Sequence, residues 1–198
     1  TGQHNTGDWR LVLPGDELPF LIEEREKMRH KHTHELKIHQ LVVRVEGWLQ
    51  VAPVSMDQVG VYFRQAEPDH QTLSTVYLDK VPARVVFDVT REGSARKVIT
   101  VRSSLIIHNR LDDSIEVRLI RHGTGIDHKL HVSAGVKQAV PLPLVHCQVY
   151  VRPQGWSLDW CKQPLTWQDV TRAGRHSDFN RVCDTRGDTT ATYRFCVS

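Results

Sequence analysis

Four histidines close together are the residues that first suggest chemistry: His30, His32, His34 and His39. On a strand, alternate residues face the same way, so the first three would converge on one metal ion, and on a helix His30 and His34 would lie one turn apart. Glu35 is out of register for a zinc-protease His-Glu-x-x-His motif, and nearby Lys and Arg residues repel a cation. We therefore expect a solvated polar segment with no metal and no cofactor.

Signatures of catalysis are absent from the sequence. It contains no Gly-x-Ser-x-Gly nucleophile elbow and no glycine-rich phosphate loop. Cys147 follows His146 directly, which is formally a thiol–imidazole pair. Adjacent residues on a strand point to opposite faces, however, so the two side chains would not meet. We expect a protein that is not an enzyme and has no catalytic residues.

The four cysteines all lie in the last part of the chain: Cys147, Cys161, Cys183 and Cys196. No Cys-x-x-Cys pair occurs, which excludes a zinc ribbon. An even count allows two disulfides in a secreted domain. Cys147 and Cys196 fall inside strand-like runs, where a free cysteine behaves as a small hydrophobic residue. The sequence therefore favours reduced thiols and a cytosolic protein over a disulfide-bonded one.

Composition indicates a globular fragment. The chain has 198 residues, 39% of them hydrophobic and 25% charged, which is enough to bury a sizeable core and argues against disorder. The formal net charge of +3 is spread along the chain, so nucleic acid is not an expected partner. No apolar run approaches the roughly 20 residues of a membrane-spanning helix. The first residue is not Met, and we expect a piece of a longer protein.

Hydrophobic periodicity predicts a mostly β fold. Apolar residues recur with a period of two in five runs: Leu41, Val43 and Val45; Val85, Phe87 and Val89; Ile115, Val117 and Leu119; Cys147, Val149 and Val151; Ala191, Tyr193, Phe195 and Val197. Turn-forming residues separate these runs, among them Glu92-Gly93-Ser94 and Gly123-Thr124-Gly125. Many short strands with one solvated face each are typical of an antiparallel β-sandwich.

Three segments need separate interpretation. Residues 17–40 are rich in charge, and we expect an extended connection with a strand near each end, with a short helix as the alternative. Residues 140–144, VPLPL, alternate as an edge strand would, where proline is tolerated. Arg186-Gly187-Asp188 spells an integrin-type tripeptide but is expected to be a hairpin turn.

Asn109 stands out because its parity matches Leu105, Ile107 and Leu111 on the apolar side of a predicted strand. A buried amide without partners costs on the order of 1–3 kcal/mol, so it is expected to hydrogen-bond a neighbouring backbone turn. We predict a structural clamp rather than a catalytic group.

Five blocks of the chain, in order, carry a resemblance to a known family: residues 18–20, 48–60, 97–111, 140–144 and 149–156. They contain an Ile-x-Asn-x-Leu strand at Ile107 to Leu111 and an Arg-Pro-x-Gly hairpin at Arg152 to Gly155. The set resembles the adaptor-binding (VAB) domain of the vacuolar protein sorting-associated thirteen family of bridge-like lipid transfer proteins. It is most similar to the family's D paralogues, and departs from the family pattern at Leu49 and Val54.

The resemblance implies a domain of tandem β-sandwich repeats. Residues 1–47 would be the end of a preceding repeat and a connecting segment, and residues 48–198 a VAB-type β-sandwich repeat. It also implies an asparagine in each repeat at the position of Asn109. The implied function is to bind organelle adaptors through short Pro-x-Pro motifs. That would recruit the lipid transfer protein to contact sites of mitochondria, endoplasmic reticulum, endolysosomes or peroxisomes.

An exposed sheet edge can accept an extended peptide as an added strand, and prolines pack on aromatic surface. The aromatic candidates for such a peptide site are Tyr62, Phe63, Tyr77, Trp156 and Trp160, each of which the core would also accommodate. Two alternatives remain. The chain would be a purely structural repeat that packs against neighbouring repeats, or a peripheral module that binds anionic membrane through Arg91, Arg96, Lys97 and Arg102.

Overall fold

The computed structural model describes residues 9–20, 39–69, 81–94, 96–155, 157–166, 169, 179–185 and 192–197. The chain divides into two compact units, Thr1–His39 and Gln40–Ser198. In the first unit, residues 9–20 hold no helix or strand. Their one turn is closed by the Asp16 amide, which donates to the Leu13 carbonyl at 3.0 Å, with Gly15 at a φ of 88°.

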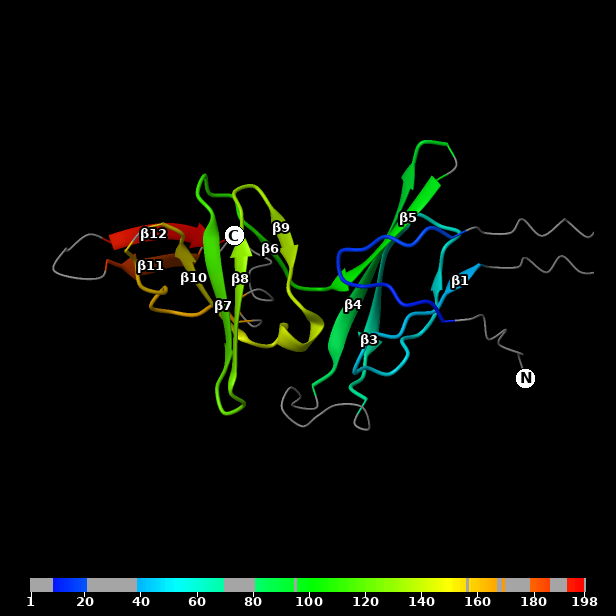
Figure 1. Cartoon of the computed structure of the whole chain (residues 1–198), viewed down its shortest axis with the longest axis horizontal. Helices are drawn as coiled ribbons and strands as arrows, with labels where there is room; N and C mark the ends of the chain where they lie inside the picture. Colours follow the sequence, from blue (N-terminus) through cyan, green and yellow to red (C-terminus); the bar gives the residue numbers. More distant parts are fainter. Residues whose placement is uncertain are drawn as a thin grey trace, which may run out of the picture. The chain divides into compact units, whose positions relative to one another are not determined.

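The second unit begins with short strands and a three-stranded antiparallel sheet of order β3-β4-β5 (Figure 1). In β4, Val85, Phe87 and Val89 are at most 1% exposed, which confirms the predicted alternation. Val86 is also buried, from the opposite face, which the alternation did not predict. The strands are β1 (Gln40–Leu41), β2 (Val54–Ser55), β3 (Gly60–Ala66), β4 (Ala83–Glu92) and β5 (Arg96–Ser103).

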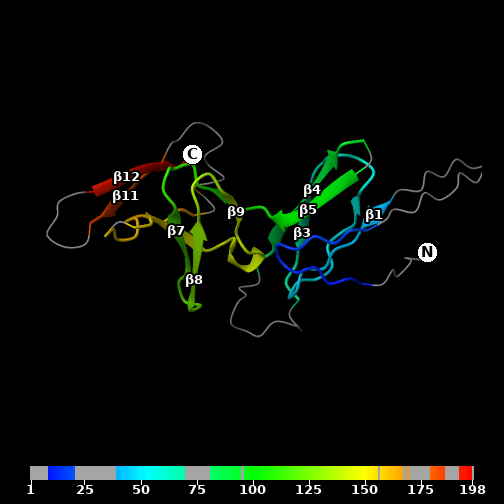
Figure 2. The same cartoon turned by 45° about the horizontal axis from the view of Figure 1, so that its top comes forward.

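A second three-stranded antiparallel sheet has the order β10-β7-β8, and two further antiparallel pairs accompany it, β6 with β9 (Figure 1) and β11 with β12 (Figure 2). Ile115, Val117 and Leu119 of β7 are buried, while Glu116 and Arg118 between them are half-buried, as predicted. The strands are β6 (Ile106–His108), β7 (Ile115–Arg121), β8 (Ile126–Val132), β9 (Lys137–Ala139), β10 (Gln148–Pro153), β11 (Phe179–Asp184) and β12 (Thr192–Val197).

Both sheets contribute to one continuous cluster of buried side chains. Trp48, Phe87 and Leu119 are among its largest members, each at most 1% exposed. The chain between the two sheets is fixed by backbone hydrogen bonds, from the Ser104 amide to the Arg84 carbonyl and from the Val140 amide to the Leu105 carbonyl. The fold is therefore mostly β with several antiparallel sheets, as expected for a β-sandwich. The described residues include no helix long and apolar enough to cross a membrane.

The prediction of an edge strand in residues 140–144 was wrong, because Leu142–Leu144 form a 3-10 helix, η1. Proline has no amide hydrogen and its φ is fixed near −65°, so Pro141 and Pro143 disfavour a strand ladder and favour a tight turn. The Leu144 amide instead donates to the Pro141 carbonyl at 2.9 Å. Leu142 and Leu144 are both buried, so burial on one side of this turn accounts for the apolar alternation.

Other segment predictions had mixed outcomes. Of the two strands expected near the ends of residues 17–40, the first is not formed by residues 17–20, and the second corresponds to β1, which begins at Gln40. Residues 21–38, with the expected connection and short-helix alternative, lie outside the described residues, as does Arg186-Gly187-Asp188. Gly123-Thr124-Gly125 does form the turn between β7 and β8. Cys147 lies just before β10 rather than within it, because its amide donates to the Leu144 carbonyl at 3.0 Å.

Candidate functional site

The aromatic residues predicted to bind a peptide are divided between two sheets. Tyr62 and Phe63 are consecutive in β3 and therefore face opposite sides of the sheet. Tyr62 packs against the core and its hydroxyl donates to the Gln58 carbonyl at 3.1 Å, so it is a core residue with a tethered tip. Trp160 lies against the other sheet, and Tyr77 and Trp156 are outside the described residues.

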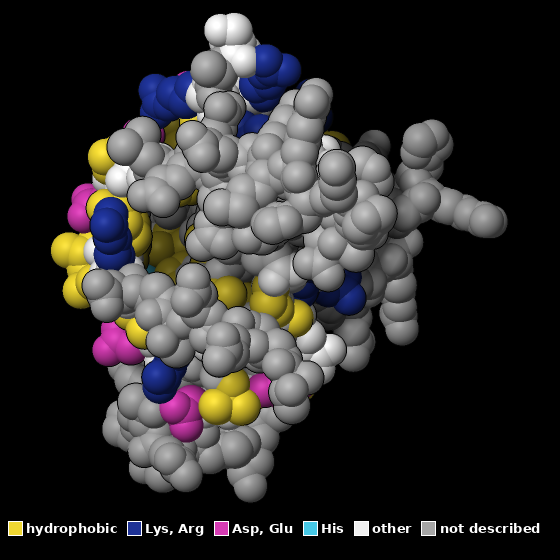
Figure 3. Space-filling model, turned by 90° about the vertical axis from the view of Figure 1, so that its right-hand side faces the viewer, with side chains coloured by type: hydrophobic (Ala, Val, Ile, Leu, Met, Phe, Trp, Pro, Cys, Tyr) yellow, Lys and Arg dark blue, Asp and Glu magenta, His cyan; other side chains and the backbone are white. Residues whose placement is uncertain are grey.

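The first candidate surface is the exposed apolar stripe of Val59, Val61 and Phe63. These side chains are 57%, 49% and 54% exposed. In the described part of the chain β3 is hydrogen-bonded as a strand only to β4. On its other side the Trp48–Pro68 bridge and the Leu49–Glu67 backbone bond place residues 48–49 just past its C-terminal end, so the unpaired edge is that of Gly60–Phe63. The face viewed in Figure 3 shows hydrophobic side chains reaching the surface beside basic and acidic ones. An apolar stripe along an open strand edge is a site where an extended chain can add.

Arg84 lies on the same face as this stripe, whereas Arg64 of β3 points to the opposite face. The Arg84 guanidinium lies 5.9 Å from the centroid of the Phe63 ring. The Arg64 side chain donates to the Pro53 carbonyl at 2.9 Å and to the Ala52 carbonyl at 3.2 Å. Arg64 therefore ties the segment before β2 to β3, and it holds the edge strand in place beside Phe63.

The second candidate surface surrounds Trp160 on the outer face of β7 and β10. The Arg152 guanidinium lies 4.4 Å from the Trp160 ring centroid, and that of Arg118 lies 5.9 Å from it. Arg152 donates to Glu116 at 2.5 Å, and Arg118 donates to Asp127 at 2.7 Å. The hydrogen bond between Arg118 and Asp127 raises the pKa of the guanidinium and lowers that of the carboxyl. Arg118 thus stays charged beside an aromatic ring.

Trp160 is among the site residues proposed from the sequence, whereas Arg118 and Arg152 are not. The signal that points to them is their outward parity, since each alternates with buried residues in its own strand. The register pairs Arg118 with Tyr150, and Glu116 with Arg152, across β7 and β10. Knowing that these two strands are neighbours would have placed the arginines on one face, but the sequence does not state the pairing.

Asn109 is buried, with 2% of its surface exposed, and follows directly after β6. Its side-chain amide donates to the Asp113 carbonyl at 2.8 Å and to the Val132 carbonyl at 3.0 Å. Its side-chain oxygen accepts from the Leu111 amide at 3.1 Å. These bonds join the loop before β7 to the end of β8, which supports the proposed role of a structural clamp.

The four basic residues considered for membrane binding lie on the β4–β5 hairpin and near its base. The Lys97 ammonium donates to the Met56 and Asp57 carbonyls, both at 2.8 Å. Arg96 lies 3.5 Å from the Glu92 carboxylate, and Arg91 donates to the Ser94 carbonyl. Arg102 donates to the Ser103 carbonyl at 3.2 Å. Local acceptors therefore already engage all four groups, which weakens the membrane alternative.

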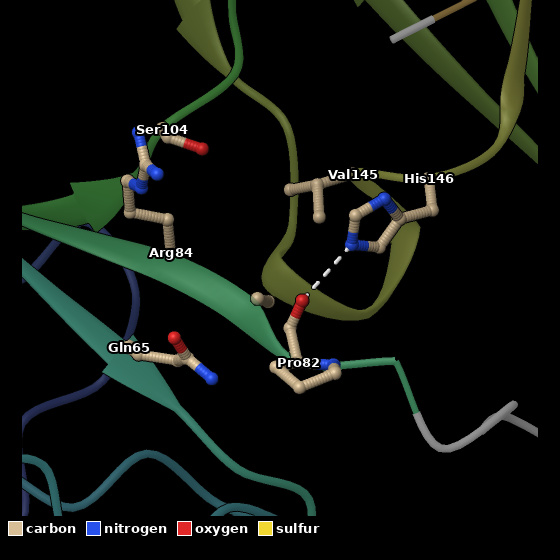
Figure 4. Close-up of a pocket in the computed structure, with 7 residues that line it drawn as sticks. Gln65, Pro82, Arg84, Ser104, Val145 and His146 are labelled. Carbon is tan, nitrogen blue, oxygen red and sulfur yellow. Dashed lines mark hydrogen bonds between the residues drawn. The ribbon is translucent and has the colours of Figure 1, made fainter.

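A shallow pocket near the joint between the sheets does not contain catalytic machinery (Figure 4). The His146 ring points to Pro82 and its Nε2 lies 3.2 Å from the Pro82 carbonyl oxygen. Gln65, Arg84 and Ser104 also line the pocket. Burial raises the pKa of the neighbouring Cys147 thiol, which makes it a poor nucleophile.

In the described ranges no three His, Cys, Asp or Glu side chains are grouped so that they could hold a metal ion. His30, His32 and His34 fall outside those ranges, so the expectation for the histidine cluster stays a prediction.

Comparison with known proteins identifies a family and two relatives to which the chain is similar. Residues 23–198 match a family described as vacuolar-sorting associated protein 13, adaptor binding domain. The chain is 44% identical over 215 aligned residues to the human intermembrane lipid transfer protein VPS13D, covering 98% of this chain and 5% of that protein. It is 34% identical over 147 residues to Vps13D of Drosophila melanogaster, covering 73% of this chain and 4% of that protein. The chain therefore spans only a small part of the length of these relatives.

Proposed function

This chain belongs to the vacuolar-sorting associated protein 13 adaptor-binding domain family, and from that premise we propose that it recognises adaptor proteins through short Pro-x-Pro motifs. It is a binding module and not an enzyme. Through it, a longer lipid transfer protein would be recruited to organelle contact sites, at mitochondria, endoplasmic reticulum, endolysosomes or peroxisomes.

The observation that carries this proposal is the open edge of β3 with Val61 and Phe63 exposed two residues apart. In an extended peptide, residues two apart direct their side chains to one face and their amides to one edge. A Pro-x-Pro motif therefore places two proline rings on one face of the peptide. Both proline nitrogens, which carry no hydrogen, then lie on the peptide edge that faces away from the domain. The amide between them stays available to bond the domain.

The spacing of the two prolines in the peptide matches the spacing of the exposed side chains on β3. Two proline rings in an extended peptide lie roughly 6.6–6.8 Å apart along the strand, as do the side chains of Val61 and Phe63. Proline packs well on aliphatic and aromatic surface, and its restricted backbone loses little entropy on binding. For a short peptide with a small contact area we expect roughly micromolar affinity.

The proposal is tested by calorimetric titration of the 198-residue chain with a Pro-x-Pro adaptor peptide and a matched peptide with both prolines replaced by alanine. Phe63→Ser should abolish saturable binding. The control variant Val136→Ser removes an apolar side chain that is 42% exposed on the loop between β8 and β9, and should bind as wild type does. If Trp160→Ala loses binding and Phe63→Ser keeps it, the peptide binds at the second candidate surface, around Trp160, and not at β3.

A second candidate function, a structural repeat that packs against neighbouring repeats of the same longer chain, is favoured by one observation. In the first unit Trp9, Leu11 and Leu13 are 62%, 86% and 58% exposed. Apolar side chains at this density are normally covered by a partner. If the folded chain gives no heat with any Pro-x-Pro peptide, this candidate is favoured over adaptor binding.

A further inference from the structure

Two cysteines distant in sequence meet at the backbone of Val151. Cys161 and Cys183 are 2% and 0% exposed. The Val151 amide lies 3.3 Å from the Cys161 sulfur, and the Cys183 thiol lies 3.4 Å from the Val151 carbonyl oxygen, to which it donates. One residue of β10 is therefore contacted by both sulfur atoms.

The backbone pairing places these cysteines opposite each other. Residues 158–162 run antiparallel to the end of β11, with a bridge between Leu158 and Thr185. The Asp159 amide donates to the Asp184 carbonyl at 2.8 Å and the Lys162 amide to the Val182 carbonyl at 3.0 Å, so the 158–162 segment has one extra residue, a bulge, between these two bonds. In an antiparallel pair, two opposed residues that do not hydrogen-bond each other are flanked by a backbone bond between their neighbours. The bond from Lys162, which follows Cys161, to Val182, which precedes Cys183, is such a flanking bond. Cys161 and Cys183 are therefore an opposed pair of this kind.

Such pairs have Cα atoms about 4.5 Å apart, which lies within the range of about 4.4–6.8 Å that a disulfide spans. A salt bridge next to the pair, from Lys162 to Asp184 at 2.8 Å, holds the same two segments together. The register, the burial and the shared contact to Val151 thus bring two thiols into the arrangement of a cross-strand disulfide.

We propose that Cys161 and Cys183 are a dithiol–disulfide site whose oxidation fastens the β11–β12 hairpin to the segment that carries Trp160. With glutathione disulfide as oxidant, one cysteine thiolate attacks a glutathione sulfur and releases one glutathione. The second cysteine thiolate then attacks the mixed disulfide and releases the other glutathione. Two electrons and two protons pass from the cysteine pair to one glutathione disulfide, which becomes two glutathione thiols.

Burial determines how fast this site reacts. It raises the pKa of Cys161 and, with the neighbouring Cys161 as a smaller cause, raises that of Cys183 to about 12. Because the thiolate is the attacking species, the closed structure is reduced and slow to react, and oxidation proceeds when the hairpin opens. Cys196 differs from this pair, since it is exposed and its thiol donates to the Asn180 side chain at 3.0 Å.

The test equilibrates the 198-residue chain in glutathione buffers of rising disulfide content, with urea just below the unfolding midpoint so that the hairpin opens. Free thiols are then alkylated, and the digest is analysed by mass spectrometry. We expect a peptide linking Cys161 to Cys183 in the wild type and in Cys196→Ser. It should be absent in Cys161→Ser and Cys183→Ser, and the oxidised wild type should melt roughly 5 °C higher than the reduced form.

The wild-type measurement is decisive even if a serine variant does not fold. Full alkylation of Cys161 and Cys183 in every buffer would overturn the proposal. Stable mixed disulfides with glutathione that never close, or a preferred link to Cys147 or Cys196, would overturn it equally. The outcome is independent of adaptor binding, because it is read from the thiols alone.

Discussion

The side-chain amide of Asn109 donates a hydrogen bond to the carbonyl of Val132, 23 residues further along the chain, at 3.0 Å. The same amide group bonds the Asp113 carbonyl, so one side chain connects the loop before β7 to the end of β8. Backbone bonds add to this joint, since the Asn109 amide donates to the Val136 carbonyl and its carbonyl accepts from the Gly135 amide.

Replacing Asn109 by serine should lower the melting temperature by roughly 5–10 °C. Serine is too short to reach Val132 and Asp113 together, and each buried carbonyl left unpaired costs about 1–3 kcal/mol. The control is Gln138→Ser, at an exposed residue of β9 whose amide makes one long bond to the Ala139 carbonyl at 3.4 Å. Thermal unfolding followed by circular dichroism checks both, and an Asn109→Ser curve matching wild type would show that the clamp is not needed.

For Asn109, the sequence predicted the burial of the side chain but not its hydrogen-bond partners. Period-two alternation predicted the buried faces of β4 and β7, because alternate side chains of a strand share one face, but it did not predict the burial of Val86 on the other face of β4. It also placed Asn109 on the apolar side, next to the end of β6. The partners of its amide could not be predicted, because Val132 is brought near by strand pairing that leaves no local mark in the sequence.

Where the sequence failed, local alternation had another cause. Leu142 and Leu144 alternate because both are buried in η1, and the two prolines were the sign that a strand was unfavourable. The facing of Cys161 and Cys183 and the neighbourhood of Arg152 and Trp160 depend on long-range register. Such relationships between the sheets are visible only once the strand order is known.

A lysine at Val61 should block peptide binding while leaving the fold intact. Val61 is 49% exposed on the edge strand, and a surface change of this kind alters stability by roughly 0.5 kcal/mol or less. A charge pointing from an edge strand prevents apolar side chains from packing beside it. Titration with the Pro-x-Pro peptide should show at least a tenfold weaker affinity than wild type, while Val136→Lys should bind normally. Equal affinity in Val61→Lys and wild type would exclude the β3 edge as the site.

The contact between Arg152 and Trp160 should have a measurable coupling free energy. A cation above an indole ring contributes about 0.5–1 kcal/mol at an exposed site and about 2 kcal/mol when desolvated, so this half-buried contact should contribute a value between these limits. We expect that value from a double-mutant cycle of Arg152→Ala and Trp160→Ala, measured by urea unfolding. The comparison cycle is Glu92→Ala with Arg96→Ala, an exposed ion pair at 3.5 Å whose coupling should be smaller. A coupling near zero for the first cycle would mean that the ring and guanidinium merely lie near each other.

The stability of the fold should decrease as the pH rises above about 9, and the buried thiols should be part of the reason. The pKa of Cys183 is raised from 9.0 to about 12 by burial, so its thiol stays protonated in the folded state while the unfolded chain ionises. Between these values the folded state binds more protons than the unfolded state, and the free energy of unfolding therefore falls with rising pH. Urea unfolding at pH 8, 9 and 10 measures this slope, and Cys183→Ala should show a shallower one. An identical slope in the two proteins would mean that Cys183 does not contribute to the alkaline loss of stability.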